Sequence, residues 1–172
     1  MDSPTYYLKN TGAGVLYSGE LPAGAVACTQ EQYQNASDWT VANGQIVPSP
    51  NLLINAQAVQ IQILSRACAA QIRAGFASTA LGAAHTYASG DVEQQNIVQS
   101  AQSTKGGLLS CTDSTGVWLR QPHTQAQAQQ VLEDFVTARD ASRTKLAERV
   151  AQVQAAKTVE TVRAIVWEDA GG

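Results

Sequence analysis

The longest regular pattern in this sequence runs from Thr124 to about Ala156 and predicts a single helix of about 50 Å. Thr124 and Gln127 have the spacing of a capping box, which marks the helix start. The apolar positions form a narrow stripe: Val131, Leu132, Phe135, Val136, Leu146, Val150 and Val153. A polar waist divides this stripe: Arg139, Asp140, Ser142 and Arg143. Because a helix with so little apolar surface is marginal alone in water, other elements must pack along it.

Residues 52–74 predict the second long helix of the fold. Their apolar residues recur at mixed three- and four-residue spacing: Ile54, Ala58, Ile61, Leu64, Cys68 and Ile72. Val59, Ile61 and Ile63 also alternate with glutamines, as they would in a strand. The alanine and glutamine content and the length of the pattern favour the helix.

Shorter elements are predicted after this helix. Asp91 can cap a helix that ends near Gln102, after which two glycines break the chain. Leu108–Cys111 and Val117–Arg120 flank a polar turn and predict a short hairpin. Thr158 begins a final helix, and we expect Trp167 in the core against the long helix.

Residues 1–50 predict a small β-rich module. The strand candidates are Tyr6–Lys9, Gly14–Tyr17, Trp39–Val41 and Gln45–Val47. Asn43-Gly44 is a strong hairpin signal because a tight turn needs positive φ there, and Pro48 and Pro50 mark the boundary. The expected fold class is therefore α+β, with this module followed by a mainly α-helical domain over residues 51–172 that contains one long helix.

Composition narrows the function classes. The net charge is -3, and no basic stripe is present, which argues against nucleic-acid binding. No window approaches eighteen consecutive apolar residues and the first ten residues resemble no secretory signal, so we expect no membrane span and folding in a cytoplasm. The three cysteines are far apart and are expected to be reduced. Hydrophobic content is 44%, but much of it is alanine, so a partner or an oligomer is expected to complete the buried surface.

The segment from Gly75 to Asn96 is unusually dense in glycines, aromatic residues and amides for a plain connector. We expect it to be irregular up to Gly90 and to form a rigid structural joint between helices. The joint residues are expected to cap helices and tie loops through side-chain hydrogen bonds: His85, Asp91, Gln94, Asn96 and His123.

The residues of this joint have two alternative interpretations, a metal site and a hydrolytic triad. His85 and His123 with Asp91 are of the residue types that bind metals, but they lack the local ligand pairs of a zinc site. Ser78, His85 and Asp91 are of the types found in a hydrolytic triad, but no nucleophile elbow accompanies them. We therefore expect no catalytic residue, no metal and no cofactor.

Four aromatic residues of the small module are candidates for partner binding: Tyr6, Tyr7, Tyr17 and Trp39. Exposed aromatic residues on a small sheet often mark a protein interface, although they can also pack on one another. Glutamine-rich helix faces are expected to be solvated, with amide ladders between helices of an oligomer as the alternative. Those glutamines are Gln57, Gln60, Gln62, Gln125, Gln127, Gln129 and Gln130.

An ordered set of residues carries a family resemblance over roughly residues 55–168. The set is Arg66, Ile72, Gly75-Phe76, Ser78, Leu81-Gly82, His85, Tyr87, Asp91, Gln94, Asn96, Trp118, His123-Thr124, Gln127, Ala156, Thr158, Val162, Ile165 and Trp167. This pattern resembles the C-terminal domain of unknown function that recurs in phage and prophage tail fibre assembly proteins. The chain departs from it at Asp91-Val92-Glu93-Gln94, where Asp and Gln are commonly adjacent. The first fifty residues resemble the opening of the same class.

The resemblance implies a non-enzymatic bacteriophage protein that acts as a chaperone or accessory of a trimeric tail fibre. The fibre polypeptide would be its partner, and self-association is a further expectation. Its location would be the host cytoplasm during assembly, and then the virion tail if it stays with the particle. Two alternatives remain: a permanent structural component of the tail or baseplate, and, more remotely, a hydrolase of cell-surface polymer.

Overall fold

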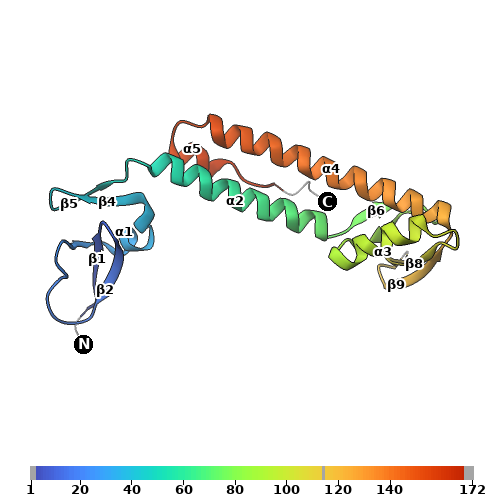
Figure 1. Cartoon of the computed structure of the whole chain (residues 1–172), viewed down its shortest axis with the longest axis horizontal. Coiled ribbons are helices and arrows are strands. Elements are labelled where there is room, and N and C mark those ends of the chain that lie inside the picture. The colour runs from blue at the N-terminus through green and yellow to red at the C-terminus, as the bar shows by residue number, and fades with distance from the viewer. Residues whose placement is uncertain (1–2, 114, 169–172) are drawn as a thin grey trace. The chain divides into compact units, whose positions relative to one another are not determined.

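The computed structural model describes residues 3–113 and 115–168, and it confirms a mixed α+β fold with N-terminal sheets and one long C-terminal helix (Figure 1). The chain forms two compact units. The first combines the chain up to Gln60 with Val153–Ile165, and the second combines Ile61–Gln152 with the segment that begins at Val166. The two longest helices therefore contribute to both units.

The first unit contains two small antiparallel sheets. Strands β1 (Thr5–Lys9), β2 (Gly12–Leu16) and β3 (Val26–Cys28) are ordered β2-β1-β3, and β4 (Trp39–Ala42) pairs with β5 (Gln45–Pro48). Between them lie the short helix α1 (Gln30–Gln34) and the 3-10 turn η1 (Ala36–Asp38). The predicted Asn-Gly hairpin is confirmed, since Asn43 has φ of 52° and Gly44 has φ of 74°.

Helical segments complete this unit through side-chain amides. The helix α2 spans Leu52–Arg73, α4 spans Gln125–Ala155, and α5 spans Val159–Ala164. Gln57 Nε2 donates to the carbonyl oxygens of Val153 and Ala156 at 3.0 and 3.2 Å, where α4 ends. Gln60, which is buried, donates to the carbonyl of Ile165 at 2.6 Å. These amides satisfy carbonyl groups that a helix end leaves without an intrahelical partner.

The second unit contains a four-stranded antiparallel sheet in the order β6-β7-β8-β9. Its strands are β6 (Phe76–Ser78), β7 (His85–Tyr87), β8 (Gly107–Thr112) and β9 (Trp118–His123). The β8–β9 hairpin was predicted. The expectation of an irregular segment up to Gly90 was wrong, because β6 and β7 pair within it. Three-residue strands are too short to show an alternating pattern in the sequence.

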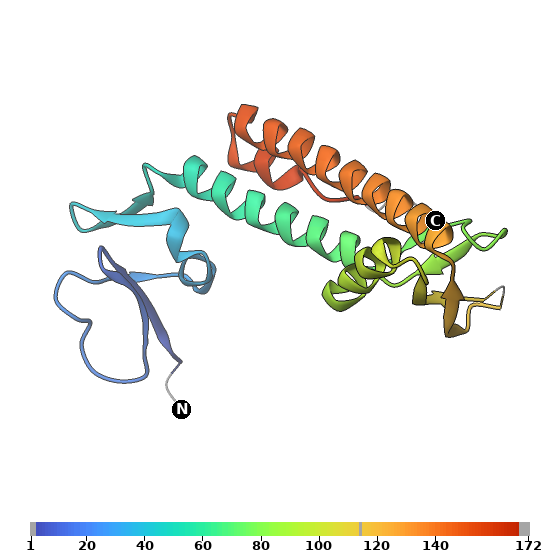
Figure 2. The same cartoon turned by 45° about the vertical axis from the view of Figure 1, so that its right-hand side comes forward.

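One face of this sheet builds the core of the unit, together with α3 (Asp91–Gln102) and the first half of α4. The buried side chains are Phe76, Tyr87, Ile97, Ala101, Leu109, Cys111, Ala128, Val131 and Phe135. Both views show α2 and α4 side by side in this unit (Figures 1 and 2), and the Cys68 thiol contacts the carbonyl of Ser142 at 3.6 Å. The polar waist of α4 is therefore partly buried, as Ser142 shows.

Trp167 contacts the long helix as expected but is only partly buried. Its Nε1 donates to Gln71 Oε1 at 2.9 Å, and Lys145 Nζ lies 4.6 Å from the ring centroid. The indole is thus held by one hydrogen bond and one cation–π contact at the edge of the packing.

Gly106 connects α3 to the sheet at a position where a side chain has no room. Its φ is 69°, and a Cβ built there would overlap the carbonyl oxygen of His123. The next residue, Gly107, lies against the Ser100 side chain in the same way. The glycine pair predicted to break the helix therefore also lets the chain at the start of β8 pass close to both β9 and α3.

Candidate functional site

The three residues of the triad alternative each take a different partner. Ser78 and His85 are paired across β6 and β7, so the two side chains lie on the same face of the sheet. His85 Nδ1 contacts the carbonyl oxygen of Thr112, while Ser78 Oγ accepts the amide of Ala80 at 3.2 Å. Asp91 forms an ion pair with Arg73, with a distance of 2.9 Å from Oδ1 to Nε. The prediction that Asp91 caps α3 was wrong, because the N-cap residue is Gly90, which makes no side-chain capping bond, and the Asp91 carboxylate is taken by Arg73. A carboxylate–imidazole–hydroxyl relay is therefore not assembled from these three residues.

His123 is buried and uses both ring nitrogens. Its Nδ1 lies 2.9 Å from the carbonyl oxygen of Gln121, which can only accept, so Nδ1 carries the proton. Its Nε2 then accepts the hydroxyl of Tyr87 at 2.7 Å. The edge of one ring faces the other, with centroids 5.5 Å apart. The pair joins the end of β9 to β7 in the middle of the core.

Burial keeps this pair neutral. Desolvation lowers the pKa of His123, because the charged imidazolium would lose its hydration. Desolvation likewise raises the pKa of the Tyr87 hydroxyl and that of the adjacent Cys111 thiol. At neutral pH the three groups are therefore an uncharged, hydrogen-bonded cluster inside the core. The arrangement serves packing and orientation, because all three side chains lie within the protein away from solvent.

The other predicted joint residues lie at the start of α3. Gln94 Nε2 donates to the carbonyl of Ser89 at 2.8 Å, and the buried Ser89 hydroxyl donates to the carbonyl of Ile72 at 2.6 Å. These bonds tie the loop before α3 to the end of α2. Asn96 lies two residues further along α3 at a partly buried position. The structure thus brings His123 to Tyr87, whereas Asp91, Gln94 and His85 serve separate contacts.

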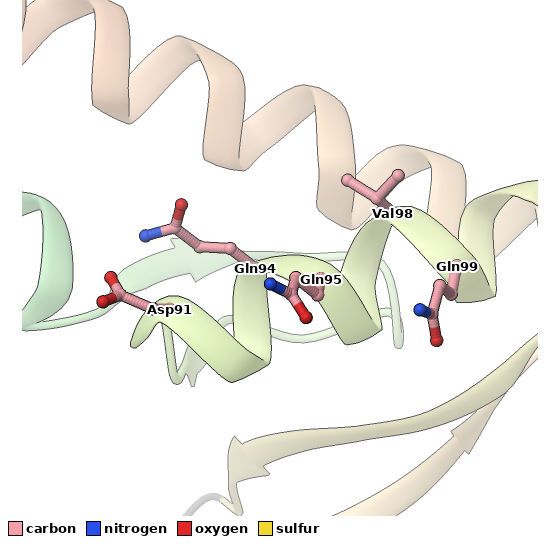
Figure 3. Close-up of a pocket in the computed structure, with 5 residues that line it drawn as sticks. All are labelled: Asp91, Gln94, Gln95, Val98 and Gln99. Carbon is pink, nitrogen blue, oxygen red and sulfur yellow. The ribbon is translucent and has the colours of Figure 1, made fainter.

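A surface hollow of about 490 Å³ lies along α3 (Figure 3). Its lining residues all come from this one helix: Asp91, Gln94, Gln95, Val98 and Gln99. Of these, Asp91 is paired with Arg73 and Gln94 with Ser89. The other polar groups that line it are the exposed amides of Gln95 and Gln99, so the hollow has the character of an open helix face.

The four aromatic residues of the N-terminal module do not form one patch. Tyr6 packs against Tyr33 of α1 with ring centroids 5.1 Å apart. Tyr7 is opposite Gly14 in β2, and its ring occupies the space that a side chain at Gly14 would need. Tyr17 is 74% exposed. Because side chains alternate along a strand, Tyr6 and Tyr7 lie on opposite faces of β1.

Trp39 lines a pocket of about 280 Å³ in the same module. The pocket is formed by β1, the turn after it, η1 and the start of β4, and its lining residues are Leu8, Lys9, Asn10, Gly12, Ala36, Ser37, Trp39 and Thr40. Of these, only Trp39 had been predicted as a candidate for partner binding. The other residues gave no signal, because the two sides of the pocket are about thirty residues apart in the chain.

The sheet of the second unit exposes apolar side chains that the sequence analysis did not single out. Trp118 is 50% exposed and Leu108 is 58% exposed. The register pairs Trp118 with Thr112 and Leu108 with Pro122, on the face opposite buried Leu109. The sequence feature that could have indicated this exposed apolar face was the run Val117-Trp118-Leu119 in a short predicted hairpin.

Metal-binding and membrane features were also sought in the part of the chain that the structure describes. Within residues 3–113 and 115–168, no group of three or more His, Cys, Asp or Glu side chains is placed to hold a metal ion. Over the same ranges, no helix combines the length and the apolar character needed to cross a membrane.

Comparison with protein-family models, with curated proteins and with solved structures finds no match for this chain. Its function must therefore be inferred from its own residues and geometry.

Proposed function

We propose that this chain is a non-enzymatic phage tail fibre assembly protein, a chaperone or accessory that binds a trimeric fibre. The observation that carries the non-enzymatic part of the proposal is that the candidate polar residues are already bonded within the chain, while the sequence resemblance supports the tail fibre part. His85, Asp91, Gln94 and His123 all bond to other groups of the chain itself. Several large aromatic and apolar side chains remain exposed, with Tyr17 and Trp118 among them. Such side chains are typical of protein interfaces.

The two units suggest separate roles. The N-terminal module would contact the fibre polypeptide, since it combines exposed Tyr17 with the pocket at Trp39. The second unit would supply a scaffold or a self-association surface, for which Leu108 and Trp118 on the outer sheet face are the candidates. The resemblance over residues 55–168 supports this assignment of the second unit to the tail fibre assembly class.

Co-expression with a tail fibre polypeptide of the same phage or prophage tests the proposal. The yield of soluble, trimeric fibre should fall several-fold when this chain is left out. Equal yields with and without it would contradict the chaperone role. The double variant Tyr17→Ser with Trp39→Ala should reduce the yield, whereas Lys105→Glu, at an exposed position of the other unit, serves as the matched control.

Mass spectrometry of purified particles separates the transient role from the permanent one. A chaperone that acts in the host cytoplasm should be absent from particles or present well below the amount of the fibre. Stoichiometric presence would instead assign the chain to the virion tail as a structural component.

A further inference from the structure

The four-stranded sheet of the second unit has two edges of unequal length. The strand β6 forms one edge with three residues, and β9 forms the other with six. Most of β9 is open to solvent: Leu119 is 45% exposed, and Trp118, Arg120 and Pro122 are exposed as well. A long open edge presents backbone groups with which another strand can pair.

The hydrogen bonds of the β8–β9 hairpin show which groups of β9 face this edge. The amide of Asp113 donates to the carbonyl of Val117 at 2.9 Å, and the antiparallel register continues from that pair along both strands. Because hydrogen-bonded and non-hydrogen-bonded pairs alternate, Ser110 and Arg120 form a non-hydrogen-bonded pair. The carbonyl of Ser110 agrees with this alternation, since it accepts the amide of Ala88 at 3.1 Å on the side of β7.

Three residues of β9 therefore turn their backbone groups away from β8 and toward the edge: Trp118, Arg120 and Pro122. Trp118 and Arg120 each present an amide and a carbonyl there, whereas Pro122 presents only a carbonyl. Within the described part of the chain, these groups make no hydrogen bond. An added strand can thus exchange backbone hydrogen bonds with Trp118 and Arg120, and Pro122 ends the pairing.

A second copy of this edge fits these groups in one antiparallel register. With Leu119 opposite its own counterpart, Trp118 of each copy exchanges both backbone bonds with Arg120 of the other. A shift that places Trp118 opposite its counterpart sets Arg120 against Gly116, whose φ is 83° and whose amide is already bonded within the turn. A shift the other way sets the two Arg120 residues against each other and Trp118 against Pro122, which has no amide. The register centred on Leu119 therefore satisfies both residues.

The side chains are also complementary in this register. Residues directly opposite each other in an antiparallel pair lie on the same face, so Arg120 of one copy lies beside the Trp118 indole of the other. A guanidinium within about 6 Å of an indole ring is attracted by a cation–π interaction. Among the residues that the structure describes, no carboxylate forms an ion pair with Arg120. The two Leu119 side chains meet at the two-fold axis and remove each other's apolar surface from water.

We infer that this chain forms a symmetric dimer by antiparallel pairing of β9 with β9 of a second copy, which joins the two sheets into one continuous sheet. Each copy contributes the same residues to the contact, so the assembly closes after two copies. The inference rests on the proposed function only in assigning self-association to the second unit. The open edge and its backbone groups do not depend on a tail fibre.

Cysteine cross-linking of the full chain tests the register. Leu119→Cys places two thiols at a non-hydrogen-bonded pair, where the Cα atoms are about 4.5 Å apart and a disulfide can form. Oxidation with copper phenanthroline should link most of this variant into dimers on a non-reducing gel. Leu108→Cys is the matched control, because it lies at an exposed position of the neighbouring strand β8 and should stay unlinked. Equal linking of the two variants, or none above the wild-type background, would overturn the inference.

Sedimentation velocity measures the dimer directly. The wild-type chain should dimerise at concentrations below about 1 mM, and a monomer throughout that range would overturn the inference. Leu119→Lys places two like charges opposite each other and should raise the dimer Kd at least about tenfold.

Leu108→Lys is the control for this variant, since it makes the same change at an exposed leucine outside the paired edge. The dimer Kd should stay unchanged in Leu108→Lys, and circular dichroism checks that both variants fold. An equal loss of dimer in both would assign the self-association to the outer sheet face and contradict the edge pairing.

The dimer and the fibre assembly role fail independently. If dimers form while fibre yield does not depend on this chain, the edge pairing stands and the fibre assignment falls. If the chain stays monomeric while Leu119→Lys lowers fibre yield, the edge binds the fibre and a second copy is not its occupant.

Discussion

Two regions of this chain gather aromatic and polar side chains, and they differ in whether those groups are already used. Around Tyr87 and His123 the hydroxyl and both ring nitrogens have partners inside the core. In the pocket at Trp39, Asn10 Oδ1 accepts the backbone amide of Val41 at 3.2 Å, while the amino group of Asn10 has no hydrogen-bond partner among the described residues. The first region contains residue types that are common in catalytic sites. Its polar groups nevertheless stabilise the fold, because buried polar groups need hydrogen-bond partners. The second region gave almost no sequence signal, and it has a side-chain donor without a partner in the described chain.

The largest expected effect is a loss of stability in the region around Tyr87 and His123, caused by a substitution at a glycine that packs against its backbone. Gly106→Ala puts a methyl group onto the carbonyl oxygen of His123 at a residue whose φ is 69°. We expect a loss of more than about 4 kcal/mol in the free energy of unfolding, or no folding at all. Urea denaturation followed by circular dichroism measures it.

Gly82→Ala is the matched control for this variant. Its φ is 90°, but a Cβ there meets nothing within 4 Å, so only conformational strain of about 1–2 kcal/mol applies. Similar losses in the two variants would show that the close approach of β9 to Gly106 does not matter.

Tyr87→Phe should have the next largest effect. The substitution keeps the ring in the core but leaves His123 Nε2 without its donor. The free energy of unfolding should fall by about 1–3 kcal/mol, the cost of an unsatisfied buried acceptor. Tyr17→Phe removes a hydroxyl from a side chain that is 74% exposed and should have no measurable effect.

The pH dependence of stability provides a third test of the buried pair. The folded-state pKa of His123 is lowered, so the unfolded chain binds the extra proton first as the pH falls. The stabilising contribution is therefore complete above the unfolded pKa of about 6.5 and is lost as the pH falls toward the folded pKa. The slope should reach at most about 1.4 kcal/mol per pH unit.

Urea denaturation between pH 7 and pH 5 measures this slope, above the range of about 3.9–4.3 where ordinary carboxylates titrate. His123→Gln should flatten the dependence over that interval, whereas His85→Gln should retain it. A slope that survives in His123→Gln would assign the acid sensitivity to another group.

The smallest expected effect concerns the outer face of the second sheet. Trp118→Ser should change the free energy of unfolding by less than about 0.5 kcal/mol, because that side chain is 50% exposed. Leu109→Ala, on the buried face of the same hairpin, should cost about 2–5 kcal/mol. Sedimentation velocity then measures whether Trp118→Ser also lowers the self-association of the chain. A large loss of stability in Trp118→Ser would mean that this face is part of the core.

Local features of the sequence predicted much of the fold. The alternation of Val59, Ile61 and Ile63 was correctly read as part of a helix, and Val59 and Ile63 prove to be 55% and 48% exposed. The long helix begins at Gln125, directly after the predicted capping residue Thr124. The short strands β6 and β7 were missed, because strands this short take their structure from pairing with their neighbours.

The glutamine-rich faces show where the sequence was insufficient. They were expected to be mostly solvated, but Gln57 and Gln60 bond carbonyl groups at the ends of other helical segments. Gln125 and Gln129 reach the carbonyl of Ala101 at 3.4 Å. A glutamine in a helix has the same sequence pattern whether its amide meets water or a distant carbonyl.

The sequence by itself determined the long helices, the caps at Thr124 and Thr158 and the Asn-Gly hairpin, because capping bonds and φ preferences act between residues a few positions apart. The tertiary structure alone decided which polar groups are used and which are left to bind. Tyr87 and His123 are 36 residues apart, and Gln57 and Val153 are 96 apart. Only the packing of the elements brings such groups within the short range of a hydrogen bond.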